Sequence, residues 1–179
     1  VDGNSVRATL AAHGLASAPA PVAFCPGAEY GPAKRWPAAH FAELGRRLGQ
    51  ADFSVWIVGS AKDAPIGAEI ERLSDGACHN LCGKTDLAQA IDLLSCARLV
   101  VSNDSGLMHV AAALDRPLVA LYGSSSTAYT PPLSPQARIL SLNLSCSPCF
   151  KRECPLGHLK CLNDLSPSMV LESAKEALS

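Results

Sequence analysis

Two apolar patterns alternate along the chain, and this alternation constrains the fold more than any other feature. Short apolar runs are typical of buried strands, and longer segments with apolar residues every three or four positions are typical of amphipathic helices. Strands are expected at 22–25, 53–58, 78–81, 99–101, 118–121 and 138–142. Helices are expected at 4–13, 37–48, 63–73, 86–96 and 106–114. One more helix, capped by Ser166 or Ser168, is expected to end near Leu178. The alternation predicts an α/β fold, a doubly wound, mainly parallel, Rossmann-like sheet.

The length of 179 residues suits one domain. Residues 1–20 are expected to form a leading helix and a linker. Residues 21–179 are expected to form the Rossmann-like domain, including a Cys-rich loop at 146–161 and the C-terminal helix. At the start of the helix expected at 86–96, Thr85 is a plausible N-cap.

Composition excludes several classes of protein. A net charge of −1 and a pI near 6.5 argue against a nucleic-acid partner, and aromatic residues make up only 5% of the chain. No apolar run reaches the roughly 20 residues that a transmembrane helix needs. The first residue, Val1, is not an initiator methionine, and no secretory signal is evident, so we expect a fragment or processed form with reduced thiols in the cytosol.

Three unusual loops each follow an expected strand, at residues 26–36, 102–106 and 123–127. In a doubly wound sheet, ligands bind at the carboxyl ends of the strands. We therefore expect these loops to converge on one edge of the sheet and to form the binding site there.

The segment Asn103–His109 joins a strand to a helix through a polar, glycine-containing turn. The first backbone N–H groups of such a helix lack intrahelical partners, and together with the helix dipole they can bind a phosphate. Ser105 and Gly106 would present these groups, and His109 could approach the phosphate from the same face. The alternative is that Asp104 or Ser105 simply caps the helix, and the two roles can coexist.

Two further loops carry polar residues beyond strand ends. Lys34 and Arg35 bring positive charge to the first loop, where a lysine can neutralise a diphosphate leaving group, unless the pair is only a solvated surface feature. The segment Gly59–Asp63 stands where a nucleoside is usually contacted, although it could be just a capped helix start. The chain has no Walker loop, dinucleotide-binding Gly-x-Gly-x-x-Gly or nucleophile elbow.

Eight cysteines fall into two groups. Four are scattered among apolar residues and are expected to behave as small hydrophobes. The others, Cys146, Cys149, Cys154 and Cys161, gather near His158 and include the residue types that bind zinc. The second half of this set lacks standard zinc spacing, so the favoured interpretation is reduced thiols that pack an irregular loop, with bound zinc as the alternative.

Four segments together carry a family resemblance: residues 24–37, 58–63, 103–109 and 146–161. In this order they resemble the ADP-heptose-dependent lipopolysaccharide heptosyltransferases, over most of the chain from Pro21 onward. The pattern Asn-Asp-Ser-Gly-x-x-His alone indicates the broader family, and the Cys-rich segment makes the resemblance to its type II members more specific.

The resemblance implies the C-terminal, donor-binding half of an inverting GT-B glycosyltransferase. Members of the family transfer heptose from ADP-heptose to the lipopolysaccharide inner core, and the type II enzymes transfer it to the first heptose. The expected partners are an N-terminal acceptor domain of the same enzyme, which carries the general base, ADP-heptose and the inner-core acceptor. The resemblance also implies a cytoplasmic enzyme, and it is the sole ground for expecting peripheral contact with the inner membrane. Alone, this half would be inactive.

The resemblance also assigns roles by position. Lys34 would neutralise the ADP phosphates, and Asp104 would contact the heptose or position its loop, so these two are the expected catalytic residues. Ser105, Gly106 and His109 would lie at the phosphates. Glu29 and Tyr30 stand where type I enzymes place small hydroxyl residues against the diphosphate, and Ser60 stands near the position of their ribose contact. No metal ligand is assigned, and zinc at the four clustered cysteines is left as an option.

Two alternatives from other functional classes remain open at this point. One is a stand-alone nucleotide-binding or regulatory module without catalysis. The other is a metal-stabilised interaction domain organised by the cysteine cluster.

Overall fold

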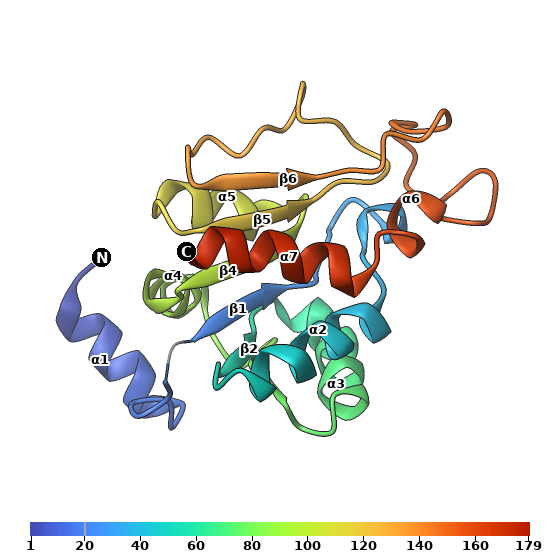
Figure 1. Cartoon of the computed structure of the whole chain (residues 1–179). Helices are drawn as coiled ribbons and strands as arrows, with labels where there is room; N and C mark the ends of the chain where they lie inside the picture. The colour runs from blue at the N-terminus through green and yellow to red at the C-terminus, as the bar shows by residue number, and fades with distance from the viewer. Residues whose placement is uncertain (20) are drawn as a thin grey trace.

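A computed structural model describes residues 1–19 and 21–179, and it shows a parallel sheet with helices on both faces (Figure 1). The sheet has six strands in the order β3-β2-β1-β4-β5-β6. Its strands are β1 (Val22–Cys25), β2 (Val55–Ile57), β3 (Cys78–Asn80), β4 (Leu99–Asn103), β5 (Leu118–Leu121) and β6 (Ala137–Leu140). The α-helices are α1 (Gly3–Ala12), α2 (Ala38–Gln50), α3 (Ala64–Leu73), α4 (Leu87–Cys96), α5 (Gly106–Ala113), α6 (Lys160–Asn163) and α7 (Pro167–Leu178). Short 3-10 turns cover η1 (Pro32–Lys34) and η2 (Ala61–Asp63).

This topology confirms the predicted doubly wound sheet, and each of the six predicted strands overlaps an observed one. Strand β1 pairs with β2 on one side and with β4 on the other, so the order of the strands reverses beside β1. Such a reversal opens a crevice at the carboxyl ends of the two strands, which is the usual ligand site of this architecture.

Three local predictions were wrong. The strand predicted from 53 begins at Val55, because the N–H of Phe53 donates to the carbonyl of Leu48 and closes the C-terminal turn of α2. The Cys-rich loop, predicted to be irregular through 161, ends in the short helix α6 from Lys160. The N-cap of α4 is Asp86 and not Thr85.

The cap of α4 follows from a reciprocal pair of hydrogen bonds. The Asp86 carboxylate accepts from the backbone N–H of Gln89, and the Gln89 side chain accepts from the N–H of Asp86. This capping box satisfies two donors at once, which a Thr85 cap would not.

The domain boundary expected after residue 20 falls on a residue outside those that the structure describes.

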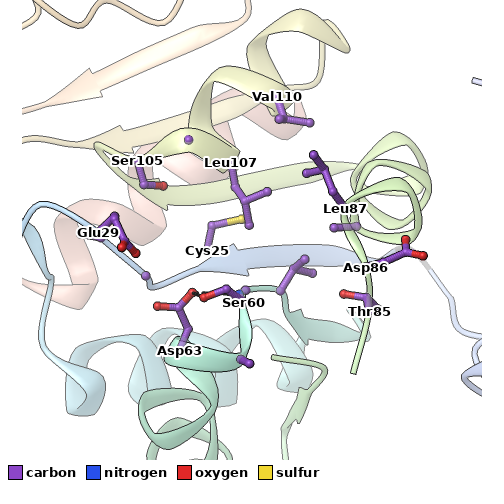
Figure 2. Close-up of a pocket in the computed structure, with 17 residues that line it drawn as sticks. Cys25, Glu29, Ser60, Asp63, Thr85, Asp86, Leu87, Ser105, Leu107 and Val110 are labelled. Carbon is purple, nitrogen blue, oxygen red and sulfur yellow. Dashed lines mark hydrogen bonds between the residues drawn. The ribbon is translucent and has the colours of Figure 1, made fainter. Parts of the chain in front are cut away.

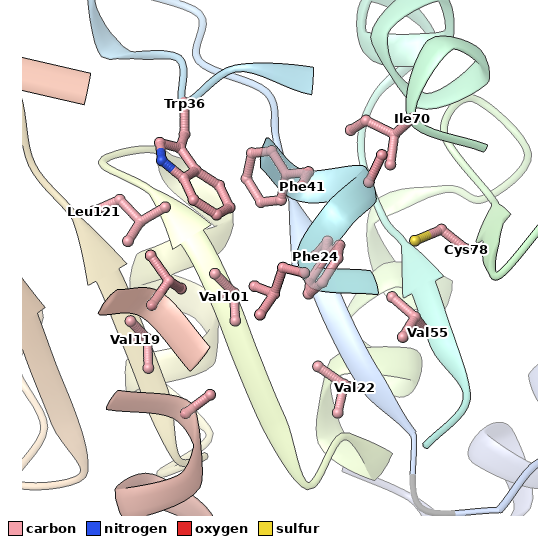
Figure 3. Close-up of a cluster of buried hydrophobic side chains, with 14 of the residues drawn as sticks. Val22, Phe24, Trp36, Phe41, Val55, Ile70, Cys78, Val101, Val119 and Leu121 are labelled. Carbon is pink, nitrogen blue, oxygen red and sulfur yellow. The ribbon is translucent and has the colours of Figure 1, made fainter. Parts of the chain in front are cut away.

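Two cores lie on opposite faces of the sheet, because neighbouring strand residues point to opposite faces. Val22 and Phe24 of β1 point to the face covered by α2, α3 and α7 (Figure 3). Ala23 and Cys25 point to the face covered by α1, α4 and α5. Each fully buried large apolar side chain contributes about 1.5–3 kcal/mol to folding.

Helix α1 docks on α4 through a buried carboxylate. The hydroxyls of Ser5 and Thr9 both donate to the Asp92 carboxylate, at 2.7 and 2.8 Å.

No helix among residues 1–19 and 21–179 is both long and apolar enough to cross a bilayer.

The contact of α2 with β3 leaves no room for a side chain at Gly45. A Cβ there would lie 2.0 Å from the Cys78 Sγ. We therefore expect Gly45→Ala to lower the free energy of unfolding by about 1–3 kcal/mol, because either the helix or the strand must move. Urea unfolding of the purified chain measures this change.

The matched control for that prediction is Gly49→Ala, on the same helix. Its Cβ would meet its nearest neighbour, Ala77 Cβ, at an ordinary 3.8 Å. It should leave stability unchanged or raise it by up to about 1 kcal/mol, because alanine favours helix more than glycine does. Equal losses in both variants would contradict the packing argument.

Candidate functional site

A cavity of about 590 Å³ opens at the carboxyl ends of β1, β2 and β4, where the strand order reverses (Figure 2). Its walls come from the loops after these strands, from α5 and from the start of α4. The lining residues are Cys25, Gly27, Ala28, Glu29, Val58, Gly59, Ser60, Ala61, Asp63, Thr85, Asp86, Leu87, Ala90, Ser105, Gly106, Leu107 and Val110.

The cavity is apolar at its walls and polar at a few points. Leu87, Leu107 and Val110 form an apolar side, and Ser60 and Ser105 place hydroxyls at the edge (Figure 2). An apolar hollow with a few fixed polar groups is typical of small-molecule and cofactor sites.

The N-terminus of α5 lies at this cavity and carries no side-chain cap. Ser105 occupies the N-cap position, but its hydroxyl makes no capping hydrogen bond and approaches the Ser102 hydroxyl at 3.4 Å. The alternative in which Asp104 or Ser105 caps the helix is therefore wrong. A Cβ built on Gly106, which lines the cavity, would meet no atom within 4 Å, so this helix end faces open space. Uncapped N–H groups at a helix start can bind an anion.

Asp104 joins all three of the predicted loops. Its Oδ2 accepts from Lys34 Nζ at 2.7 Å, from Ser125 Oγ at 2.6 Å and from Thr130 Oγ1 at 3.1 Å. The Lys34 and Asp104 side chains are only 15% and 3% exposed, so the ion pair is well shielded from water. The predicted convergence of the loops is confirmed, and its centre is a carboxylate.

Asn103 anchors the first loop at both ends, a role that sequence reasoning missed. Its side-chain amide donates to the carbonyl of Pro26 at 2.7 Å and accepts from the N–H of Trp36 at 3.1 Å. The signal was available, because an asparagine at the end of a buried strand needs hydrogen-bond partners. The loop that carries Lys34 is thus fixed to β4.

Ser60 and Asp63 form a second reciprocal cap, at η2. The Asp63 carboxylate accepts from both the N–H and the hydroxyl of Ser60, each at 2.8 Å. A Cβ on Gly27 would lie 2.5 Å from Asp63 Oδ1, so the first loop passes directly over this carboxylate. The capped helix start expected as an alternative is present. Asp63 ends the segment that was expected near a nucleoside and lines the cavity, although it was not singled out as a site residue.

Glu29 lines the cavity, and its carboxylate accepts from Lys62 at 2.6 Å. This hydrogen bond and the charge of Lys62 lower the pKa of Glu29, with smaller contributions from Arg152 and Arg35. Tyr30, half-exposed, donates its hydroxyl to the carbonyl of Phe150 at 2.7 Å.

His109 is exposed on α5 and does not line the cavity. The structure therefore brings Glu29, Ser60, Ser105 and Gly106 to the cavity. Lys34 and Asp104 lie together beside the neighbouring loops.

The four clustered cysteines line one small cavity of about 20 Å³ together with His158. Backbone N–H groups, with that of Leu159 first, lower the pKa of Cys154. Burial raises the pKa of the Cys78 and Cys82 thiols to about 11 and 12, as expected for inert apolar cysteines. Across residues 1–19 and 21–179, no three His, Cys, Asp or Glu side chains are placed to hold a metal ion.

Comparison with known proteins gives consistent matches. A family model described as glycosyltransferase family 9 (heptosyltransferase) matches residues 4–160. Lipopolysaccharide heptosyltransferase 2 of Salmonella typhimurium is 48% identical over 162 residues, which is 88% of this chain and 47% of that protein. Lipooligosaccharide heptosyltransferase 2 of Haemophilus influenzae is 48% identical over 164 residues, with the same coverage.

A solved structure agrees with these relatives. The structure of the E. coli ADP-heptose lps heptosyltransferase II superposes with a TM-score of 0.87 and 43% identity, covering 99% of this chain and 52% of that one. The chain thus spans about half the length of the relatives it matches.

Proposed function

Because this chain belongs to glycosyltransferase family 9, the heptosyltransferases, we propose that it is the donor-binding half of an inverting GT-B enzyme that uses ADP-heptose. The enzyme transfers heptose to the first heptose of the lipopolysaccharide inner core, as its type II resemblance implies. The observation that carries the proposal is the cavity at the strand reversal, with the uncapped N-terminus of α5 in its wall. Lys34 pairs with Asp104, the residue that precedes this helix start.

The donor fits this edge of the sheet in two parts. The adenosine occupies the cavity, where the apolar side of Leu87, Leu107 and Val110 accepts the base. The diphosphate extends past Ser105 and Gly106, at the uncapped start of α5, toward Lys34. Ser60 and Glu29 lie at the cavity edge and face the ribose and the sugar hydroxyls.

The chemistry that these groups support is departure of a diphosphate. The bond between the anomeric carbon and the phosphate oxygen breaks while an acceptor oxygen bonds to the same carbon from the opposite side. Negative charge grows on the leaving ADP, and Lys34 together with the α5 N-terminus stabilises it. Asp104 accepts from Lys34 Nζ at 2.7 Å and so holds it in place.

The acceptor site and the general base lie on the other half of the protein. The chain spans about 47% of its relatives, and the fold described is one Rossmann-like half of a GT-B pair. Closure of two halves over the donor would exclude water, which otherwise hydrolyses it. We place the whole enzyme in the cytoplasm, at the inner membrane face where its lipid-linked acceptor lies.

The cysteine cluster needs no metal in this proposal. Its thiols line a cavity too small for a substrate and are not placed as a ligand set among the described residues. Metal analysis of protein purified without added zinc separates this reading from the metal-stabilised module. One equivalent of bound zinc would favour the module.

A transfer assay of the full-length enzyme tests the proposal. Purified enzyme, ADP-heptose and an inner-core acceptor that carries one heptose should yield ADP and an acceptor extended by one heptose, detected by mass spectrometry. Binding of ADP-heptose without ADP release, with both halves present, would favour the stand-alone nucleotide-binding module.

A further inference from the structure

The loop that carries Lys34 is held from outside by the Cys-rich segment, residues 146–161. In Figure 1 this segment leads into α6 next to the loop after β1. The N–H of Ala33 donates to the carbonyl of Arg152 at 3.0 Å. In return the Arg152 Nε–H donates to the carbonyl of Tyr30 at 2.6 Å, and the Tyr30 hydroxyl donates to the carbonyl of Phe150 at 2.7 Å.

The two backbones approach so closely that only glycine fits between them. A Cβ on Gly31 would lie 2.5 Å from the carbonyl oxygen of Arg152. The contact therefore combines close packing with three hydrogen bonds, across about 120 residues of sequence. It fixes the middle of the loop, whose two ends, at Pro26 and Trp36, are anchored by Asn103.

Tyr30 connects this contact to Lys34. The Lys34 ammonium lies 5.2 Å from the centroid of the Tyr30 ring, and the Arg152 guanidinium carbon lies 5.3 Å from the same centroid. The electron-rich ring attracts both cations. Lys34 is thus held by two groups, the Asp104 carboxylate and the Tyr30 ring, and Arg152 fixes the second of them.

We infer that Arg152 is a positioning residue for the donor site: by fixing Tyr30, it holds the Lys34 ammonium where the donor diphosphate binds. The inference rests on the proposed function and assigns the Cys-rich segment a part in it. Arg152 itself touches Tyr30, so its effect on transfer passes through Lys34.

A double-mutant cycle in the full-length enzyme tests this coupling. Arg152→Ala should lower kcat/KM for ADP-heptose about tenfold, since small misplacements of a charge-stabilising group are costly, and should leave the acceptor KM within about twofold. In a Lys34→Ala background the same substitution should change kcat/KM by less than about threefold, because the group it positions is already gone. Arg152→Lys keeps a cation near the ring and should recover part of the loss.

Lys151→Ala is the matched control, since Lys151 is the exposed neighbour in the same segment. It should leave kcat/KM within about twofold. A loss for Arg152→Ala no larger than that of Lys151→Ala overturns the inference. So does a tenfold loss that persists unchanged in the Lys34→Ala background, because Arg152 would then act by another route.

The cycle also separates this inference from the proposed function. A large effect of Lys34→Ala with none of Arg152→Ala removes only the positioning role. If Lys34→Ala itself has no effect, the proposed diphosphate site fails, and the inference fails with it.

Discussion

Replacing Lys34 by alanine should lower kcat/KM for heptose transfer by about 100-fold or more in the full-length enzyme. The ammonium is the positive side chain at the meeting point of the three loops, paired to Asp104 at 2.7 Å and largely shielded from water. Removing one donor that stabilises developing charge typically costs about 10²–10³ in rate. The variant also leaves the Asp104 carboxylate near the departing diphosphate, which adds repulsion.

Steady-state kinetics with ADP-heptose measures the loss. The matched control is Lys175→Ala, an exposed lysine on α7 that pairs with Glu172 away from the cavity. That variant should retain wild-type kinetics. A Lys34→Ala enzyme whose turnover stays within about threefold of wild type, roughly 0.65 kcal/mol, would remove Lys34 from the mechanism.

Asp104→Ala should cost both stability and activity. Its carboxylate accepts from Lys34, Ser125 and Thr130, so the substitution removes the acceptor of a shielded ammonium and of the Ser125 hydroxyl, while the Thr130 hydroxyl keeps the Ser126 carbonyl at 3.3 Å. Breaking one side of a buried ion pair costs about 3–5 kcal/mol, and the remaining exposure of Lys34 reduces this figure. We expect the free energy of unfolding to fall by about 2–4 kcal/mol, measured in urea.

Two further variants bracket this effect. Asp104→Asn keeps one acceptor oxygen and should lose less stability than Asp104→Ala. The exposed Asp164→Ala should stay within about 0.5 kcal/mol of wild type. If Asp104→Ala behaves like Asp164→Ala, the carboxylate does not hold the three loops together.

The sequence predicted the architecture well because buried parallel strands leave a strong local pattern. Runs such as Val22–Cys25 and Leu118–Leu121 are apolar throughout, and the structure buries every residue in them. The convergence of the loops followed from topology alone, since parallel strands bring their carboxyl ends to one edge. The structure shows this convergence directly, because Lys34 and Ser125 both donate to the Asp104 carboxylate.

Contacts between distant segments were not predictable in the same way. Nothing local to Tyr30 indicates that its hydroxyl meets the Phe150 carbonyl, 120 residues away. The N-cap of α4 could have been predicted correctly from the local sequence, because Asp86 and Gln89 have the spacing of a capping box. Ser60 and Asp63 repeat that pattern at η2, three residues apart, so the capping role of Asp63 could have been predicted by the same rule.

The most direct test of the central claim is a calorimetric titration of ADP into this chain and into its Gly106→Glu variant. Gly106 begins α5, and its Cβ would point into open space at the cavity, so a glutamate there fits the fold and favours the helix start. Its carboxylate would occupy the anion site. We expect saturable ADP binding by the wild-type chain, at least tenfold weaker binding by the variant, and unchanged urea unfolding. Equal ADP affinity in the two proteins would contradict a phosphate site at the α5 N-terminus.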